Sequence, residues 1–251
     1  MNAGRILTLG EVSKRLGPRG AILTNDHIVL TPKPQGHFHA RGYFAKDAVL
    51  SDAASALAIA DEIAARFEND GIQAVVGPTV AGVSIAALVA TQLYLRTGDD
   101  TINWGYAEET EDEIEVCRVI DDVLQDRREK LLLPNKAIRV IRRGLPAYFN
   151  GMRTLVVEDV FSSGGSAKVT MIAAEQVGAI IVGMAVICNR SGLTATDFGV
   201  PKLEVLFNIP MEMFPEETCQ LCADLVPINM TVGHGAKFFA RCPDSKVPRK
   251  E

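Results

Sequence analysis

Apolar residues recur at helical spacing in three stretches of the chain. Residues 51–68 carry small and aliphatic side chains at every third or fourth position, and Ser51 or Asp52 is suited to cap a helix there. Residues 80–95 and 167–177 repeat this spacing with many small side chains. The pattern therefore predicts three helices, each with an apolar face that packs against a core.

Short runs rich in β-branched residues alternate with these helices and predict buried strands. They lie at residues 72–76, 137–141, 154–157, 180–187 and 203–207. Strands that alternate with helices are typical of an α/β fold with a mainly parallel sheet. Ligands bind beyond the carboxyl ends of such strands, so we expect the Gly-containing loops 77–82 and 161–166 to lie at that edge.

Two parts of the chain depart from this alternation. Residues 108–129 hold ten acidic and three basic side chains, which predicts a solvated, partly helical insertion that reaches about residue 136. The residues after the last predicted strand contain three of the five cysteines and predict an irregular lobe or tail. We therefore expect an N-terminal segment that contributes to a hood (1–47), a core (48–207) and a C-terminal segment (208–251).

Composition and charge exclude several classes of protein. Hydrophobic residues make up 47% of the 251 residues and charged residues 23%, as in globular proteins, and the net charge of −5 argues against a broad nucleic-acid surface. Residues 108–129 alone contribute −7, so the rest sums to +2 and suits a polyphosphate ligand. The longest apolar run, Ala179–Cys188, is about half a membrane span. No secretory signal is recognisable and the cysteines are odd in number, so we expect a reduced, cytoplasmic protein.

The segment 156–166, which reads VVEDVFSSGGS, combines the features of a ligand site. Glu158 and Asp159 follow an apolar strand, and at least one of them is expected near the core, where an unpaired charge is costly. Small residues then lead into a helix, and their amides and hydroxyls suit an anion. These small residues are Ser162, Ser163, Gly164, Gly165 and Ser166. Carboxylates beside a phosphate cradle predict a sugar phosphate, whereas a strand end with a Gly-Ser turn is the open alternative.

This motif resembles the phosphoribosyl pyrophosphate (PRPP) motif of type I phosphoribosyltransferases, with serines at 162 and 163 where threonines are common. The resemblance implies an α/β fold, with a mainly parallel sheet flanked by helices and a small hood lobe. It also implies that Glu158 and Asp159 contact the ribose hydroxyls and that residues 162–166 hold the 5′-phosphate. The loop 77–82 resembles the pyrophosphate-binding loop of the family, although a simple strand-to-helix turn is the alternative. Its candidate contacts are Pro78, Thr79, Val80, Ala81 and Gly82.

Residues 25–47 resemble the N-terminal segment of orotate phosphoribosyltransferase-like proteins. Lys46 is then a candidate PRPP contact. Arg190 resembles a position where arginine contacts the orotate carboxylate, which a guanidinium matches because its donors form a fork. For both residues the alternative is an ordinary surface side chain.

The resemblance implies a pentosyltransferase that moves ribose 5-phosphate from PRPP to a nucleobase such as orotate and releases pyrophosphate. It further implies Mg²⁺ bound through PRPP, a homodimer, and no nucleic-acid or membrane partner. Two alternatives stay open, namely a phosphoribosyltransferase for a different base and a non-catalytic PRPP-binding regulator. The regulator is motivated by residues 107–136, which stand where the family has a mobile catalytic loop but are acidic and lack histidine.

Basic residues that face the phosphates must therefore be sought elsewhere or at the end of this region. Arg127, Arg128, Lys130 and Lys136 are the candidates near its end. Four arginines flank the strand that carries the PRPP motif and are expected close to the phosphate cradle. They are Arg139, Arg142, Arg143 and Arg153.

The C-terminal cysteines raise the question of a zinc site. Cys219 and Cys222 have the spacing of a zinc knuckle, with His234 and Cys242 as loosely placed further ligands, and buried thiols without a metal are the alternative. The remaining histidines, His27, His37 and His39, are expected at the surface or near the substrate. Cys117 has no base partner in the sequence pattern, so we do not expect it to act as a nucleophile.

Overall fold

The computed structural model describes residues 8–16, 22–23, 25–32, 36–110, 138–209 and 212–250. Its contacts divide the chain into two compact units. The first unit contains Asp52–Asn208, and the second combines Gly10–Ser51 with Ile209–Glu251. The second unit is therefore built from two segments that lie far apart in the sequence.

The first unit is built on a six-stranded sheet with the order β10-β9-β8-β5-β6-β7. Neighbouring strands are parallel except β6 and β7, which pair antiparallel. The elements of this unit are α3 (Ala53–Phe67), β5 (Ala74–Pro78), α4 (Ala81–Thr97), β6 (Asn103–Thr110), β7 (Ile138–Val140), η2 (Leu145–Tyr148), β8 (Arg153–Phe161), α6 (Gly165–Gln176), β9 (Ile180–Asn189), α7 (Ala195–Phe198) and β10 (Leu203–Asn208).

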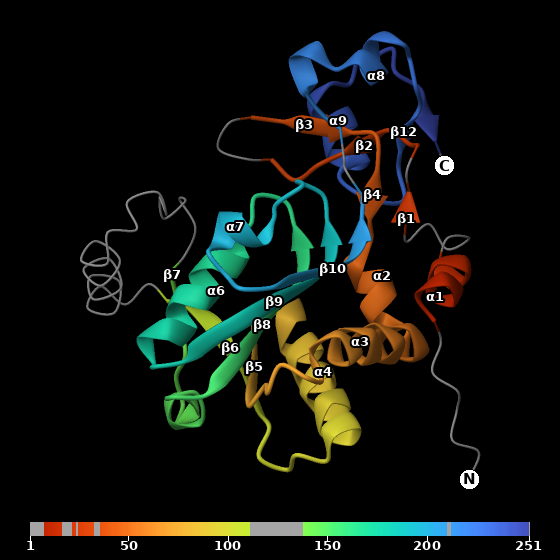
Figure 1. The fold of residues 1–251 in the computed structure, drawn as a ribbon. Coiled ribbons are helices and arrows are strands. Elements are labelled where there is room, and N and C mark those ends of the chain that lie inside the picture. Colours follow the sequence, from red (N-terminus) through yellow and green to blue (C-terminus); the bar gives the residue numbers. More distant parts are fainter. Residues whose placement is uncertain are drawn as a thin grey trace. The chain divides into compact units, whose positions relative to one another are not determined.

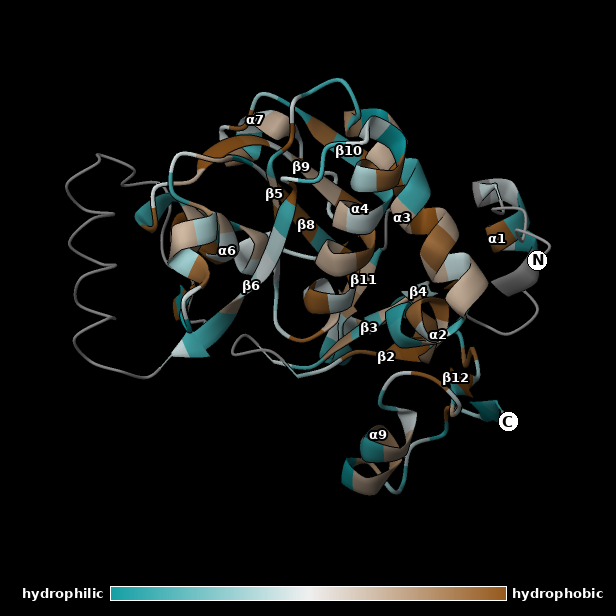
Figure 2. Cartoon of the chain, turned by 90° about the horizontal axis from the view of Figure 1, so that it is seen from below, coloured by the Kyte–Doolittle hydropathy of each residue, from teal (hydrophilic) through white to brown (hydrophobic). Residues whose placement is uncertain are grey.

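Helices cover both faces of this sheet, with α3 and α4 on one side and α6 on the other (Figure 1). Asp52 caps α3 by accepting a hydrogen bond from the Ser55 backbone N–H at 3.1 Å, which confirms the predicted cap. The α6 face buries large side chains such as Phe149, Met171 and Met184. Figure 2 shows the hydrophobic colour along β8 and a hydrophilic colour along β6. The central strands β5 and β8 are almost entirely buried, whereas β10 at one edge of the sheet is only half-buried.

The second unit contains short strands and helices. β2 (Ile28–Val29), β3 (Phe38–Ala40) and β11 (Met213–Pro215) form a three-stranded sheet, in which β3 pairs with both others. Two smaller pairs are β1 (Ile22–Leu23) with β4 (Tyr43–Phe44) and β12 (Ile228–Asn229) with β13 (Arg249–Lys250). The helices are α1 (Leu9–Leu16), α2 (Lys46–Ser51), η3 (Glu216–Thr218), α8 (Gln220–Ala223) and α9 (Gly235–Arg241).

The predicted α/β class, the three helices and the mainly parallel sheet are confirmed, and one expectation is wrong. It concerns the acidic insertion, because residues 108–110 belong to β6 and pair with β7. The many polar side chains of β6 hide that strand from a search for buried apolar runs. The rest of the insertion, residues 111–137, lies outside the described residues.

The C-terminal residues, expected as an irregular lobe or tail, form short elements that pair with residues from the N-terminal segment. β11 pairs with β3, and His27 forms an isolated bridge with Ile228. Since each C-terminal strand is two or three residues long, periodicity along the sequence does not reveal it. No helix among the described residues is both long and apolar enough to cross a membrane.

Candidate active site

The loops after β5 and β8 lie at the point of the sheet from which the chain adds further strands in opposite directions. β5 and β8 are parallel neighbours with Val76 opposite Val156 (Figure 1). Both strands continue past this pair, β5 to Pro78 and β8 to Phe161, and each is followed by a short loop and a helix. From β5 the chain moves to β6 on one side, and from β8 it moves to β9 on the other. The predicted loops therefore share the switch point at which α/β proteins bind ligands.

Glu158 and Asp159 are both buried within β8, with exposed fractions of 4% and 6%. Glu158 Oε1 accepts a hydrogen bond from the Asp159 backbone N–H at 3.0 Å, and Asp159 Oδ1 accepts one from Val160 N–H at 2.6 Å. The second oxygen of Glu158, Oε2, is buried without a hydrogen-bond partner among the described residues. Burial, together with the adjacent Asp159 carboxylate, raises the pKa of Glu158. A ligand that brings hydroxyl groups would satisfy this oxygen.

The loop after β8 requires glycine at position 164. Gly164 has φ +70° and precedes the first turn of α6. A Cβ atom there would lie 2.7 Å from Leu193 Cδ1 and 2.9 Å from Phe198 Cζ. No side chain caps the start of α6, so its first backbone N–H groups remain able to bind an anion. Ser162 is half-buried and Ser163 is exposed beside them.

The loop after β5 is folded tightly on itself. A Cβ atom on Gly77 would clash with the Gly82 carbonyl, and one on Gly82 would clash with Pro78 Cδ. The peptide bond between Thr79 and Val80 is cis. Val80 is 87% exposed at the tip of the loop. Both glycines are therefore needed for the backbone to close this turn.

Arg139 fastens the same loop from β7. It is 7% exposed, and its Nη1 donates to Thr79 O at 3.2 Å, Thr79 Oγ1 at 3.0 Å and Ala107 O at 3.1 Å. Its Nη2 pairs with Glu109 Oε1 at 2.9 Å. This buried guanidinium contacts four acceptor atoms and holds the loop in place. Sequence reasoning missed this role. The only sequence signal was its membership in an arginine group.

The other three arginines of that group are placed differently. Arg142 donates to Thr110 Oγ1, and Arg143 pairs with Glu108 at 3.1 Å. Arg153 begins β8 and donates to Asp70 O and Gly71 O. It lies at the amino end of the strand, opposite to the PRPP motif, so the expectation that it lies near the cradle is wrong.

Arg190 follows β9 directly, and its backbone contacts the last residue of β8, just before the motif loop. Its N–H donates to Phe161 O at 3.0 Å, because Phe161 is opposite Asn189 in the parallel pair. Lys46 is the first residue of α2, in the second unit. Four basic candidates lie outside the described residues: Arg127, Arg128, Lys130 and Lys136. Cys117 also lies outside them.

The predicted zinc ligands are only partly brought together. Cys219 and Cys222 are close, but the Nε2 atom of His234 instead lies 3.0 Å from Thr31 Oγ1. Cys242 packs against a neighbouring apolar cluster and is not among the grouped ligand atoms. His27 and His39, expected at the surface or near the substrate, are fully buried beside Cys219 and Cys222. Their spacing of twelve residues carries no metal signal by itself, so sequence reasoning missed them.

Comparison with known proteins agrees with this geometry. The family profile described as the phosphoribosyl transferase domain matches residues 46–213. The orotate phosphoribosyltransferase of Thermus thermophilus is 30% identical over 201 residues, which are 78% of this chain and 91% of that protein.

Solved structures agree at the level of the fold. A structure of Mycobacterium tuberculosis orotate phosphoribosyltransferase in complex with PRPP has a TM-score of 0.51 and 16% identity, and the match covers 80% of this chain and 96% of that chain. An adenine phosphoribosyltransferase from Thermoanaerobacter pseudethanolicus has a TM-score of 0.50 and 13% identity, with coverages of 80% and 99%. The fold is thus common to proteins named for different bases. The family profile and the curated relative together show that this chain belongs to the phosphoribosyltransferase family, in its type I, orotate phosphoribosyltransferase-like branch.

Proposed function

We propose that this protein transfers ribose 5-phosphate from PRPP to orotate and releases pyrophosphate. The observation that carries the proposal is the buried pair Glu158–Asp159 directly before the left-handed Gly164 and the uncapped start of α6. This order of groups offers oxygen acceptors for hydroxyls and amide donors for a phosphate. The choice of orotate is supported by the curated relatives that carry this name, since the fold is shared with an adenine enzyme.

Each part of PRPP has a proposed partner. Glu158 and Asp159 bind the two ribose hydroxyls, while the residues from Ser162 to Ser166 bind the 5′-phosphate. The loop from Pro78 to Gly82 binds the pyrophosphate through backbone groups. Arg190, whose backbone joins the end of β8, binds the carboxylate of the base.

The proposed mechanism uses positioning and electrostatics rather than covalent catalysis. As the bond between ribose and pyrophosphate breaks, positive charge develops on the ribose ring. Because the pKa of Glu158 is raised, the acid pair holds a proton near neutral pH, so it donates to one hydroxyl and accepts from the other. Its remaining negative charge stabilises the developing positive charge, and the two loops hold the ribose for attack by the base nitrogen.

Mg²⁺ belongs to the proposal as an ion bound through PRPP. The residues fit such an ion because the buried pair Glu158–Asp159 keeps a negative charge beside the loop proposed for the phosphate, which favours a hard cation there. When bound, Mg²⁺ supplies charge neutralisation on the pyrophosphate.

A base-panel assay tests the function. Orotate, adenine and other nucleobases are supplied with PRPP and Mg²⁺, and release of pyrophosphate is measured. We expect turnover with orotate. Turnover with another base only would replace orotate by that base, and PRPP binding without turnover for any base would establish the non-catalytic regulator instead.

The double variant Glu158→Gln/Asp159→Asn tests the site. Removing both acids should lower the rate by about 100-fold or more, because charge stabilisation in the transition state is lost. The matched control, Glu68→Gln/Asp100→Asn, changes two exposed acids of the same unit and should keep its rate. A double variant that turns over like the control would remove the acid pair from the mechanism.

A homodimer and a cytoplasmic location complete the proposal. The dimer is supported by the resemblance to the family, and the location by the reduced cysteines expected of that compartment. Light scattering of the purified chain measures the mass in solution, and a single-chain mass would contradict the dimer.

A further inference from the structure

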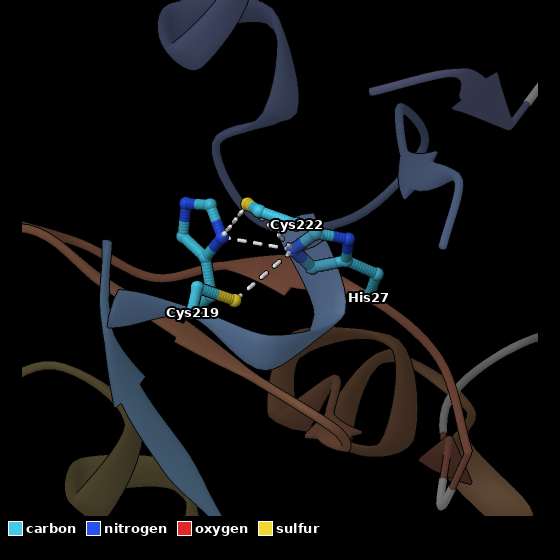
Figure 3. A group of neighbouring side chains, drawn as sticks. His27, Cys219 and Cys222 are labelled. Carbon is cyan, nitrogen blue, oxygen red and sulfur yellow. Dashed lines mark hydrogen bonds between the residues drawn. The ribbon is translucent and has the colours of Figure 1, made fainter. Parts of the chain in front are cut away.

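Four side chains with metal-ligand atoms converge in the second unit. They are His27, His39, Cys219 and Cys222, and their ligand atoms all lie within 4.8 Å of one another. His27 precedes β2, His39 lies in β3, Cys219 precedes α8 and Cys222 lies within it. Figure 3 shows His27, Cys219 and Cys222 pointing toward a common centre. Both histidines are fully buried, and Cys219 is 4% exposed.

The distances between these atoms approach those of a tetrahedral zinc site. Zinc bonds of about 2.0 Å to nitrogen and 2.3 Å to sulfur place neighbouring ligand atoms about 3.3 to 3.8 Å apart. Cys222 Sγ lies 3.3 Å from His39 Nδ1, and both sulfurs lie 3.8 Å from His27 Nε2. The two nitrogens are 2.8 Å apart and need to separate by about half an ångström.

Outer contacts orient both histidines for binding. His27 Nδ1 lies 2.7 Å from the Val226 carbonyl oxygen, which only accepts, so Nδ1 carries the proton and Nε2 faces the cluster as a lone pair. His39 Nε2 lies 3.3 Å from the carboxylate of Glu216, which Arg241 holds at 2.7 Å. A donor at that nitrogen leaves the His39 Nδ1 lone pair facing the cluster. Such outer partners are typical of metal-bound histidines.

The two ring nitrogens that face the cluster lie close to each other. With both outer nitrogens protonated, two lone pairs face each other across 2.8 Å. A cation relieves this repulsion by accepting both lone pairs.

We propose that His27, His39, Cys219 and Cys222 bind one zinc ion. Two thiolates and two neutral imidazoles balance the charge of Zn²⁺, so the complete site is neutral and suited to burial. Sulfur and imidazole ligands in a tetrahedral set favour zinc over the hard cations. Since four protein ligands fill the coordination shell, the ion is structural. It joins the two sequence-distant segments of the second unit.

Metal content and a cobalt spectrum test the site in the full chain. The purified protein, passed over a chelating resin, should retain about one zinc ion per chain. Cobalt added to the metal-depleted chain should give the visible absorption of a tetrahedral ion and thiolate-to-cobalt charge transfer. These two readouts use the unchanged sequence and need no variant to fold.

A pair of matched variants assigns the ligands. Cys219→Ser/Cys222→Ser should lose stoichiometric zinc and the charge-transfer band. His234→Ala/Cys242→Ser removes the two residues that sequence spacing suggested and the structure leaves out, and it should keep both. A wild-type chain that neither retains zinc nor takes up cobalt would overturn the proposal. So would a native disulfide between Cys219 and Cys222, or loss of zinc only from the control variant.

Discussion

At the scale of single residues, Glu158 is the acid on which burial acts most strongly. It lies 4% exposed with one oxygen lacking a partner among the described residues, and its pKa is raised to about 8. Because the pKa is higher in the folded state than in the unfolded state, the protonated carboxyl favours folding relative to the ionised one. That contribution is fully present below the unfolded pKa and is lost as the pH rises through the folded pKa.

The Glu158→Gln variant should therefore gain stability relative to wild type as the pH rises. At pH 5 the two free energies of unfolding should differ by less than about 1 kcal/mol, and at pH 9 the variant should be more stable by about 4 to 5 kcal/mol. Urea unfolding at both pH values, without PRPP, measures the difference. Glu217→Gln, which changes an exposed acid, should show no such trend. Equal pH profiles for Glu158→Gln and wild type would show that ionisation of Glu158 costs nothing.

At the scale of elements, the site depends on loops that neighbouring strands hold. The loop after β5 closes through Gly77 and Gly82, and Arg139 of β7 fastens it at Thr79. The loop after β5 therefore depends on an antiparallel edge strand of the sheet.

Arg139→Lys should loosen this loop. A lysine keeps the charge but loses the planar fork, so Thr79 O or Ala107 O loses its donor, at a cost of about 1 to 3 kcal/mol. We expect a higher KM for PRPP, measured in the pyrophosphate assay. Arg143→Lys is the control, because Arg143 is 70% exposed and makes a surface ion pair with Glu108. Equal KM values for the two variants would contradict the role of Arg139.

At the scale of the whole molecule, the chain forms two units with separate cores. Phe238, 4% exposed, packs with Val29 and Ile228 from both segments of the second unit. Phe67, fully buried, belongs to α3 of the first unit. We therefore expect that a cavity created in one core destabilises mainly the unit that contains this core.

Phe238→Ala and Phe67→Ala form a reciprocal pair. Each should cost about 3 to 5 kcal/mol in its own unit. Hydrogen exchange should show faster exchange in β2 and β12 for Phe238→Ala, and in β9 and β10 for Phe67→Ala. If both variants accelerate exchange equally throughout the chain, the two units unfold as one.

Sequence patterns predicted the helices and strands whose apolar residues recur at regular spacing, and the motif whose functional residues are adjacent in the chain. The helices over 53–67, 81–97 and 165–176 bury many small and aliphatic side chains, the strands β5 and β9 are nearly continuous apolar runs, and β8 contains a short one before Glu158. The PRPP motif was recognisable because its acids, serines and glycines are adjacent in the chain. Local spacing is sufficient for such features, since each depends on neighbouring residues.

By itself, then, the sequence determined the α/β class, the two loops at the carboxyl ends of the strands and the family to which the chain belongs. Only the tertiary structure brought His27 and His39 to Cys219 and Cys222, and Arg139 to Thr79. It also separated Arg153 from the motif that lies a few residues further along β8. The physical reason is that strand pairing and burial join residues that are far apart in the sequence, such as His27 and Cys222, which are separated by 195 positions. Their separation along the chain carries no trace of that proximity.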